Sequence, residues 1–474
     1  MKRTVVLNVV GLTASSLERH QASDAHTPAA GRMHDFATRG AMARIVPALP
    51  AVTCTAQSTY LTGTPPAQHG IVANGWYNRE LAEVQFWKQA NQLVSGKKIW
   101  DELRELDPTF TCAKLFWWYN MYSSADYSIT PRPMYPADGR KFFDVYSWPY
   151  SIRTEIKKDL GEFPFATFWG PAAGLPSPQG ARDAATRWIA ESAKWIENKY
   201  SPTLSLVYLP HLDYNFQRLG PNHPGTLQDL REIDNIVGGL MDFFAKRSVQ
   251  VILLSEYGIT PVDTPIHINR ILRKKNWIVV KDELGREMLD CGASKAFAVA
   301  DHQIAHVYLK DPSFAGEVRA TLEKEPGIAQ VLDRAEQAKL GIDHPRAGDL
   351  IAVARENAWF TYYYWFDDNA APDFARCVDI HRKPGYDPVE LFLDPKISAV
   401  KAKIFWRLLK KKLGFRMLMD VIPLDATLVK GSHGCRPENE NDYPVFISER
   451  KDLLSTEQIE ATDVYHLIKR HVLY

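Results

Sequence analysis

The sequence predicts an α/β fold, a three-layer sandwich in which helices cover both faces of a central, mostly parallel sheet. Short apolar runs are continuous rather than alternating, as in strands buried on both faces, and amphipathic helical patterns lie between them. The 474 residues are enough for one large core or two medium ones. We therefore expect a single α/β domain over residues 1–474.

Four apolar runs end in polar or turn-forming residues and are interpreted as buried parallel strands: Thr4 to Val10, Leu204 to Leu209, Val249 to Leu254 and Leu350 to Val353. Ala181 to Glu197 and Leu227 to Lys246 have the apolar periodicity of amphipathic helices. Because strands alternate with helices, the sequence predicts βαβ units and a sheet covered on both faces.

Residues 76–175 interrupt this pattern with Trp, Tyr, Pro and Arg, including the aromatic run from Phe116 to Tyr122. Loops at the carboxyl ends of parallel strands usually carry the binding site, so we expect an aromatic-rich insertion or cap there. A local aromatic core under a long loop is the alternative. Composition does not separate a cap that stacks on a nucleobase from one that covers a lipid-like tail.

Charge and cysteine usage narrow the possible functions. The 57 Lys and Arg balance the 56 Asp and Glu, so no global field attracts a nucleic acid duplex or an anionic membrane. The five cysteines are scattered without close pairs, which suits a reducing cytoplasm. The apolar stretch near the N-terminus is interrupted by Asn8 and has no cleavage site, so we interpret it as a core strand rather than a signal peptide. No 18-residue apolar run predicts a membrane span, and oligomeric state stays open.

Ile397 to Leu413 form a basic amphipathic stretch. A helix of this kind can contact lipid headgroups. Because no acyl-anchor signal accompanies it, a solvated outer helix of the core is the preferred interpretation, with peripheral membrane contact as the alternative.

The residues that indicate chemistry lie in separated segments. Pro47 to Gly63 contains Thr53 at the start of a predicted helix, and Asn74 follows shortly after. Asp213 and Glu256 each follow a predicted strand. A further candidate, His433, lies in the C-terminal part of the sequence. A threonine hydroxyl at a helix start has backbone N–H groups and the positive end of the helix dipole beside it, which suits a phosphoryl oxygen. It needs a metal or a base to become nucleophilic, and the alternative role for Thr53 is an ordinary helix N-cap.

From Val5 to Gly434, the order and spacing of these segments resemble the alkaline phosphatase superfamily, in its type I phosphodiesterase/nucleotide pyrophosphatase branch. There a threonine precedes a short helix that ends in Thr-Gly, and His-Gly-Ile and Asn follow, as in Thr53, Thr62-Gly63, His69-Gly70-Ile71 and Asn74. The resemblance implies an alkaline-phosphatase-like fold, Thr53 as nucleophile and a phosphate hydrogen bond from Asn74. It also implies that the C-terminal segment, residues 396–474, returns His433 to the site.

The resemblance implies divalent metal ions, usually two zinc ions, but the ligand set departs from the family. Val10 stands where the first-strand Asp is expected, Gln217 stands four residues after Asp213, and Glu256-Tyr257 replaces an Asp-His pair. Asp213, Glu256 and His433 offer two carboxylates and one imidazole, enough for one ion but few for two. Asn8 is a residual candidate on the first strand. We expect at most one metal by the family's own ligands, or a rearranged site, with zinc as the first choice and manganese as the alternative.

Asp301 and His302 are candidates for such a rearrangement, against the alternative of packed or surface polar residues. His306 would share a strand face with His302 but lie about 13 Å from it, too far to chelate the same ion. His381, between two acids, is a further candidate, with the same alternative.

Two classes of function follow. The first is hydrolysis of a phosphodiester, pyrophosphate or phosphate monoester in a small phosphorylated substrate, through Thr53 and with divalent metal assistance. The second is a catalytically degenerate member that binds a phosphorylated metabolite or partner, as the changes at Val10, Gln217 and Tyr257 suggest. A phosphotransferase is a third possibility, because related folds host transfer reactions.

Overall fold

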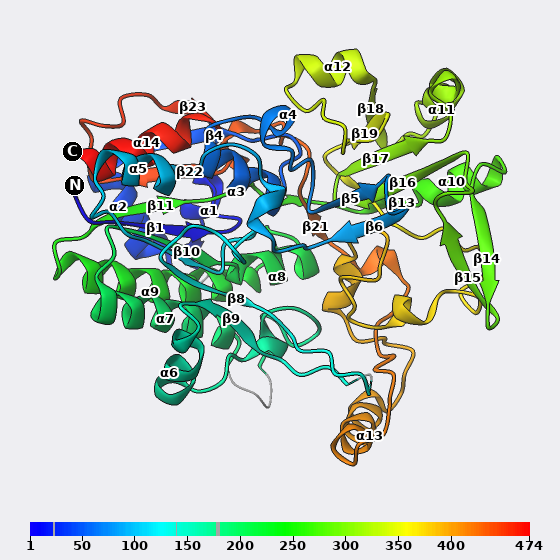
Figure 1. Cartoon of the computed structure of the whole chain (residues 1–474), viewed down its shortest axis with the longest axis horizontal. Coiled ribbons are helices and arrows are strands. Elements are labelled where there is room, and N and C mark those ends of the chain that lie inside the picture. Colours follow the sequence, from blue (N-terminus) through cyan, green and yellow to red (C-terminus); the bar gives the residue numbers. More distant parts are fainter. Residues whose placement is uncertain (22–23, 139, 177–180) are drawn as a thin grey trace.

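A nine-stranded sheet carries the candidate site (Figure 1). The computed structural model describes residues 1–21, 24–138, 140–176 and 181–474. In order across the sheet, the strands are β23 (Gln458–Glu460), β4 (Ala41–Val46), β22 (Val445–Ser448), β11 (Gln250–Leu254), β1 (Thr4–Val9), β10 (Leu204–Leu209), β7 (Cys112–Leu115), β8 (Tyr127–Pro131) and β9 (Val145–Trp148). The strands from β11 to β8 are parallel, while β22 and β9 are antiparallel to their neighbours. The predicted α/β class with a mostly parallel sheet is confirmed.

Helices cover both faces of this sheet (Figure 1). On one face, α7 (Ala184–Tyr200) contacts β10 and α9 (Thr226–Ala245) contacts β11. On the other, α14 (Asp463–Leu473) packs on α3 (Thr53–Thr62) and α5 (Ile99–Leu106). The two helices predicted from periodicity, α7 and α9, differ from expectation only at their ends.

A second core lies beside the first. It surrounds an antiparallel sheet of β16 (Ala296–Asp301), β17 (Ile304–Leu309), β19 (Leu350–Ala354) and β18 (Ile328–Leu332). The prediction that Leu350 to Val353 form a parallel strand is wrong. β19 is antiparallel but largely buried, so it lacks the alternation that distinguishes most antiparallel strands. The domain predicted over residues 1–474 thus contains two apolar cores.

The remaining helices are α1 (Ala14–Leu17), α2 (Gly31–Arg39), α4 (Pro66–His69), α6 (Ser151–Leu160), α8 (His211–Leu219), α10 (Ile268–Lys274), α11 (Ala315–Leu322), α12 (Arg334–Lys339) and α13 (Val400–Lys412). Short strands pair as β2 (His20–Gln21) with β3 (Asp24–Pro28), β5 (Gly75–Asn78) with β6 (Glu83–Phe86), β12 (Thr260–Pro261) with β21 (Gly431–Ser432), β13 (Thr264–Ile266) with β20 (Ala358–Phe360), and β14 (Val279–Glu283) with β15 (Arg286–Asp290).

Residues 76–175 do not form one insertion. Their strands β7, β8 and β9 belong to the central sheet, so interpreting this whole segment as a cap is wrong. These strands have four or five residues each, and β7 carries Lys114 in its middle, which hides the strand pattern. Other parts of the segment, around Trp87, Trp118, residues 131–135, residues 140–143 and residues 165–176, do line the cavity of the candidate site.

The basic stretch predicted from sequence contains α13, which projects from the rest of the chain (Figure 1). α13 is described throughout, and none of its residues is buried; Val400 and Ile404 pack partly buried against the second core. Among the helices that the structure describes, none is long and apolar enough to cross a bilayer.

Candidate functional site

A cavity of about 1480 Å³ is lined in part by Thr53, Asp213, Tyr257, His302 and His433. Asp213 follows β10 and Tyr257 follows β11, and both strands are parallel neighbours of β1. Because the carboxyl ends of adjacent parallel strands meet at one edge of a sheet, the fold brings these side chains together. Thr53 enters from the start of α3, and His433 follows β21.

Thr53 is the first residue of α3, and Val52 occupies the N-cap position. Among the described residues, no side chain caps this helix. The Thr53 hydroxyl instead lies 3.1 Å from the hydroxyl of Tyr257, which donates to Asp213 Oδ1 over 3.4 Å. Thr53 is therefore not an N-cap, and its hydroxyl is directed into a polar network beside the positive end of the helix dipole.

Asn74 is held by two partners. Its Oδ1 accepts from the Cys54 backbone N–H at 3.0 Å, and its Nδ2 and backbone N–H donate to the Asp301 carboxylate at 3.1 and 2.8 Å. Asp301 also accepts from His302 Nδ1 at 2.8 Å. Burial raises the pKa of Asp301 to about 6. Asp301 thus fixes the orientation of both Asn74 and His302.

Four aromatic rings form a column at the site. The Tyr257 and His433 rings stack with centroids 3.6 Å apart, His433 and His302 lie 3.7 Å apart, and His302 stacks on Tyr386 at 3.6 Å. His433 Nδ1 donates to the Ala51 carbonyl at 2.8 Å. In both histidines Nδ1 is engaged, whereas Nε2 is buried without a hydrogen-bond partner among the described residues. Burial lowers the pKa of each imidazole well below its ordinary value, so both are neutral with a lone pair at Nε2.

Glu256 does not line the cavity. Its Oε1 accepts from Asn8 Nδ2 at 2.5 Å and from Gln57 Nε2 at 2.6 Å. Burial raises the pKa of Glu256 to about 8 and that of Asp213 to about 7. Asp213 therefore faces the cavity while Glu256 is tied to its neighbours behind it.

A model of the family described as type I phosphodiesterase / nucleotide pyrophosphatase matches residues 4–387. The chain belongs to this family. Family members depend on divalent metals, although the identity of the ion varies with the ligand set.

Solved structures confirm the fold. Human ectonucleotide pyrophosphatase / phosphodiesterase 5 is 15% identical with a TM-score of 0.59, and phosphonoacetate hydrolase from Sinorhizobium meliloti 1021 is 14% identical with a TM-score of 0.57. Each similarity covers 100% of this chain and 95% of the other. An uncharacterized pyrophosphatase/phosphodiesterase of Schizosaccharomyces pombe is 21% identical over 248 residues, 49% of this chain and 43% of that protein. The chain thus matches less than half the length of that curated relative.

The ligand types that face the cavity, one carboxylate and two imidazoles, suit one metal ion rather than two. His433 Nε2 lies 4.0 Å from Asp213 Oδ1, and the unpartnered Nε2 of His302 belongs to the adjacent ring. A histidine whose Nδ1 donates to a carbonyl or carboxylate is typical of metal ligands. On the other side, Val10 is buried in the apolar core and Tyr257 replaces the expected histidine, so the second set of ligands is missing.

The five predicted ligands are not all brought together. Within the described chain, no three of them have ligand atoms within 4.8 Å of one another. Asp213, His302 and His433 line the cavity, whereas Asp301 and Glu256 lie behind it. The one such group found is His211, Asp229 and Glu232, and Arg182 already pairs with both carboxylates at 2.8 and 3.4 Å.

Sequence reasoning missed three residues that shape the site. Tyr257 was noted only as a lost ligand, yet its hydroxyl joins Thr53 to Asp213. Gln57, four residues after Thr53 and so on the same helix face, holds Glu256, and its spacing could have revealed it. The Tyr386 hydroxyl donates to Gln217 Oε1 at 3.0 Å. Gln217, which stands where the family has a histidine, thus positions the Tyr386 ring that stacks on His302. Nothing in the sequence around Tyr386 signals this contact.

Proposed function

We propose that the chain hydrolyses a phosphodiester, a pyrophosphate or a phosphate monoester with Thr53 as the nucleophile. The observation that carries this proposal is the position of Thr53 at the start of α3, where it lines the cavity and does not serve as the helix cap. Its hydroxyl lies 3.1 Å from the Tyr257 hydroxyl. Family membership supports the same class of chemistry. An inactive variant of murine ectonucleotide pyrophosphatase / phosphodiesterase 5 has been solved with AMP, and the S. meliloti hydrolase with phosphonoacetate, which supports a small phosphorylated ligand here.

In this reaction the Thr53 oxygen attacks phosphorus, the bond from phosphorus to the leaving oxygen breaks, and water later opens the phosphothreonine. Tyr257 orients the Thr53 hydroxyl and connects it to Asp213, the carboxylate that can accept its proton. The start of α3 stabilises charge on the phosphoryl oxygens. The resemblance implies the same for the Asn74 amide, which lies behind the lining of the cavity. A divalent ion, zinc in the first instance or manganese, would be held by Asp213, His302 and His433 only if their ligand atoms came closer together than they lie here, and it would supply Lewis acidity to the phosphoryl group.

The test compares Thr53→Ala with Thr53→Ser, which keeps the hydroxyl. Substrates are bis(4-nitrophenyl) phosphate, 4-nitrophenyl phosphate and ATP, each with added zinc or manganese. We expect Thr53→Ala to lower kcat at least about 1000-fold and Thr53→Ser to retain much more activity. Unchanged turnover in Thr53→Ala would refute the proposal.

A binding-only function is the second candidate, favoured by the apolar Val10 and by Tyr257 in the second ligand set. It predicts saturable binding of a phosphorylated ligand without turnover under any divalent ion. A phosphotransferase would instead show product formation that depends on an added acceptor alcohol.

We also propose a cytoplasmic location. The support is that Cys54, Cys112, Cys291, Cys377 and Cys435 are all unpaired thiols in the described chain.

A further inference from the structure

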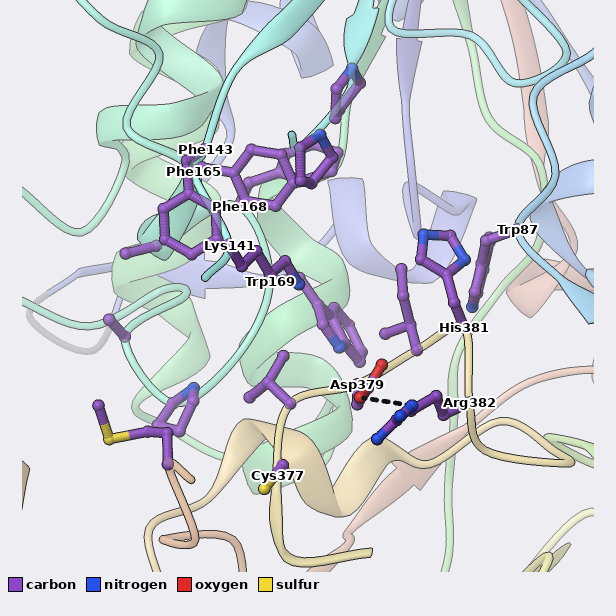
Figure 2. Close-up of a pocket in the computed structure, with 18 of the residues that line it drawn as sticks. Trp87, Lys141, Phe143, Phe165, Phe168, Trp169, Cys377, Asp379, His381 and Arg382 are labelled. Atoms are coloured by element: carbon purple, nitrogen blue, oxygen red, sulfur yellow. Dashed lines mark ion pairs between the residues drawn. The ribbon is translucent and has the colours of Figure 1, made fainter. Parts of the chain in front are cut away.

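The cavity extends from Thr53 along an aromatic wall. Figure 2 shows Phe143, Phe165 and Phe168 gathered on one side and Trp87 beside His381 on another. Phe143 and Phe165 stack on each other with centroids 4.7 Å apart and planes at 4°. The volume of about 1480 Å³ exceeds the roughly 300–1,000 Å³ usual for small-ligand sites. The site therefore offers far more apolar room than a phosphoester group needs.

α13 forms the far part of this wall. Ile404, Phe405 and Leu408 line the cavity, and Phe405 is nevertheless 68% exposed. Outside the lining, Trp406 and Leu413 are 54% and 64% exposed. Apolar surface thus continues from the interior of the cavity to the outside of the molecule. A water-soluble substrate would need apolar contacts inside the cavity only, not on the exposed face of α13.

The same helix carries strong positive charge. Its thirteen residues include six Lys and Arg and no Asp or Glu. Within the part of the chain that the structure describes, four lysines have no carboxylate partner: Lys401, Lys410, Lys411 and Lys412. Exposed aromatic residues among lysines are the pattern of a helix that lies in the headgroup region of an anionic bilayer.

Contacts hold α13 against the chain between β8 and β9. Lys411 Nζ donates to the Lys141 carbonyl at 2.7 Å, and Arg416 Nε donates to the Asp138 carbonyl at 3.0 Å. Lys411 Nζ also lies 5.8 Å from the ring centre of Phe143. The aromatic wall and the basic helix are therefore one structural unit at the cavity.

We propose that the substrate is a membrane lipid with a phosphoester head: its hydrocarbon tail occupies the aromatic cavity, its head reaches Thr53, and α13 docks on an anionic bilayer. The inference rests on the proposed hydrolysis and names its substrate class. The hydrocarbon tail accounts for the volume and the apolar wall. The bilayer accounts for the exposed aromatic residues and for the lysines that have no carboxylate partner among the described residues. A nucleoside would leave most of the cavity and all of α13 without a role.

The first test uses methyl, octyl and hexadecyl esters of 4-nitrophenyl phosphate, which differ only in the tail. We expect kcat/KM to rise roughly 100-fold from methyl to octyl, well below the limit for full burial of the added methylenes. Leu408→Asp, which places a charge in the wall, should remove most of that rise. Equal kcat/KM along the series, with turnover of the methyl ester still dependent on Thr53, would overturn the lipid inference and leave the proposed hydrolysis intact.

Binding separates the two proposals if no ester is turned over. In Thr53→Ala, calorimetry compares octyl phosphate with methyl phosphate. Tighter binding of octyl phosphate supports the lipid site even without hydrolysis, and equal binding, or a preference for AMP over octyl phosphate, overturns it.

The second test is sedimentation with vesicles of phosphatidylglycerol, against vesicles of phosphatidylcholine. The wild-type chain should sediment with the anionic vesicles only, and the double variant Trp406→Asp, Leu413→Asp should stay in solution with an unchanged melting temperature. Leu284→Asp is the matched control, because Leu284 is a fully exposed leucine on the β14–β15 turn. Absence of binding, binding that survives the double variant, or a dimer that the double variant dissociates would overturn docking through α13.

Discussion

Replacing Tyr257 by phenylalanine removes one hydroxyl while keeping the ring that stacks on His433. That hydroxyl is the link between Thr53 and Asp213, at 3.1 and 3.4 Å. A hydrogen bond to a charged partner contributes about 1.5–3 kcal/mol, which corresponds to roughly 10- to 150-fold in rate. We therefore expect kcat of Tyr257→Phe to fall by roughly 10- to 150-fold with little change in KM, because the bond acts on the nucleophile rather than on substrate binding.

The assay is steady-state release of 4-nitrophenol from the substrate on which the wild type is most active. Tyr363→Phe is the matched control, since Tyr363 is equally buried and its hydroxyl has no hydrogen-bond partner among the described residues. A Tyr257→Phe enzyme within about twofold of wild type, a difference below 0.5 kcal/mol, would refute the link between Tyr257 and the nucleophile.

Three further predictions follow from buried groups. Burial lowers the pKa of Lys114 to about 7. Between pH 7 and 9 the unfolded chain therefore binds more protons at this group than the folded chain does. Lys114 thus makes the free energy of unfolding rise with pH, by up to about 1 kcal/mol per pH unit. Denaturant titrations should show a shallower pH dependence in Lys114→Met; identical slopes would contradict the assignment. Asp301→Asn should lower both kcat and the free energy of unfolding, the latter by about 1–3 kcal/mol. The reason is that an amide cannot accept all the hydrogen bonds that the carboxylate accepts from Asn74 and His302. A variant as stable as the wild type would count against this. Mass spectrometry of protein purified without chelators should find about one zinc or manganese ion per chain and none in Asp213→Ala, His433→Ala; two ions in the wild type would show that the second site is intact.

The parts predicted well from sequence are those encoded locally. β1, β10, β11, α7 and α9 each follow from a continuous apolar run or a helical periodicity, and tertiary packing did not alter them. The segment from Thr53 to Asn74 is also nearly contiguous. Its spacing left an ordinary helix cap open for Thr53, and it was the resemblance to the phosphodiesterase branch that favoured a site at the start of α3.

Contacts between distant segments are not encoded locally, so the sequence named His302 and Glu256 as candidate ligands without predicting their surroundings. His302 reaches the site only because the turn after β16 lies against the segment of His433, 131 residues later. No periodicity encodes that approach, and the same holds for Glu256, whose carboxylate is turned toward Asn8 and Gln57. β7, β8 and β9 were missed for a different reason, since strands of four or five residues with polar members are too short to show a pattern.

Val10 and Tyr257 both stand where the family's second set of ligands is expected. An aspartate at position 10 would be buried in the apolar core. Instead the chain has valine there, Asn8 and Gln57 hold Glu256, and the raised pKa of Glu256 keeps it largely protonated near neutral pH. With that half of the site closed by neutral hydrogen bonds, Tyr257 supplies a hydroxyl where a metal-bound histidine is expected. In the proposed mechanism one ion and Tyr257 together serve Thr53. Restoring only Val10→Asp should therefore destabilise the fold without restoring a second metal.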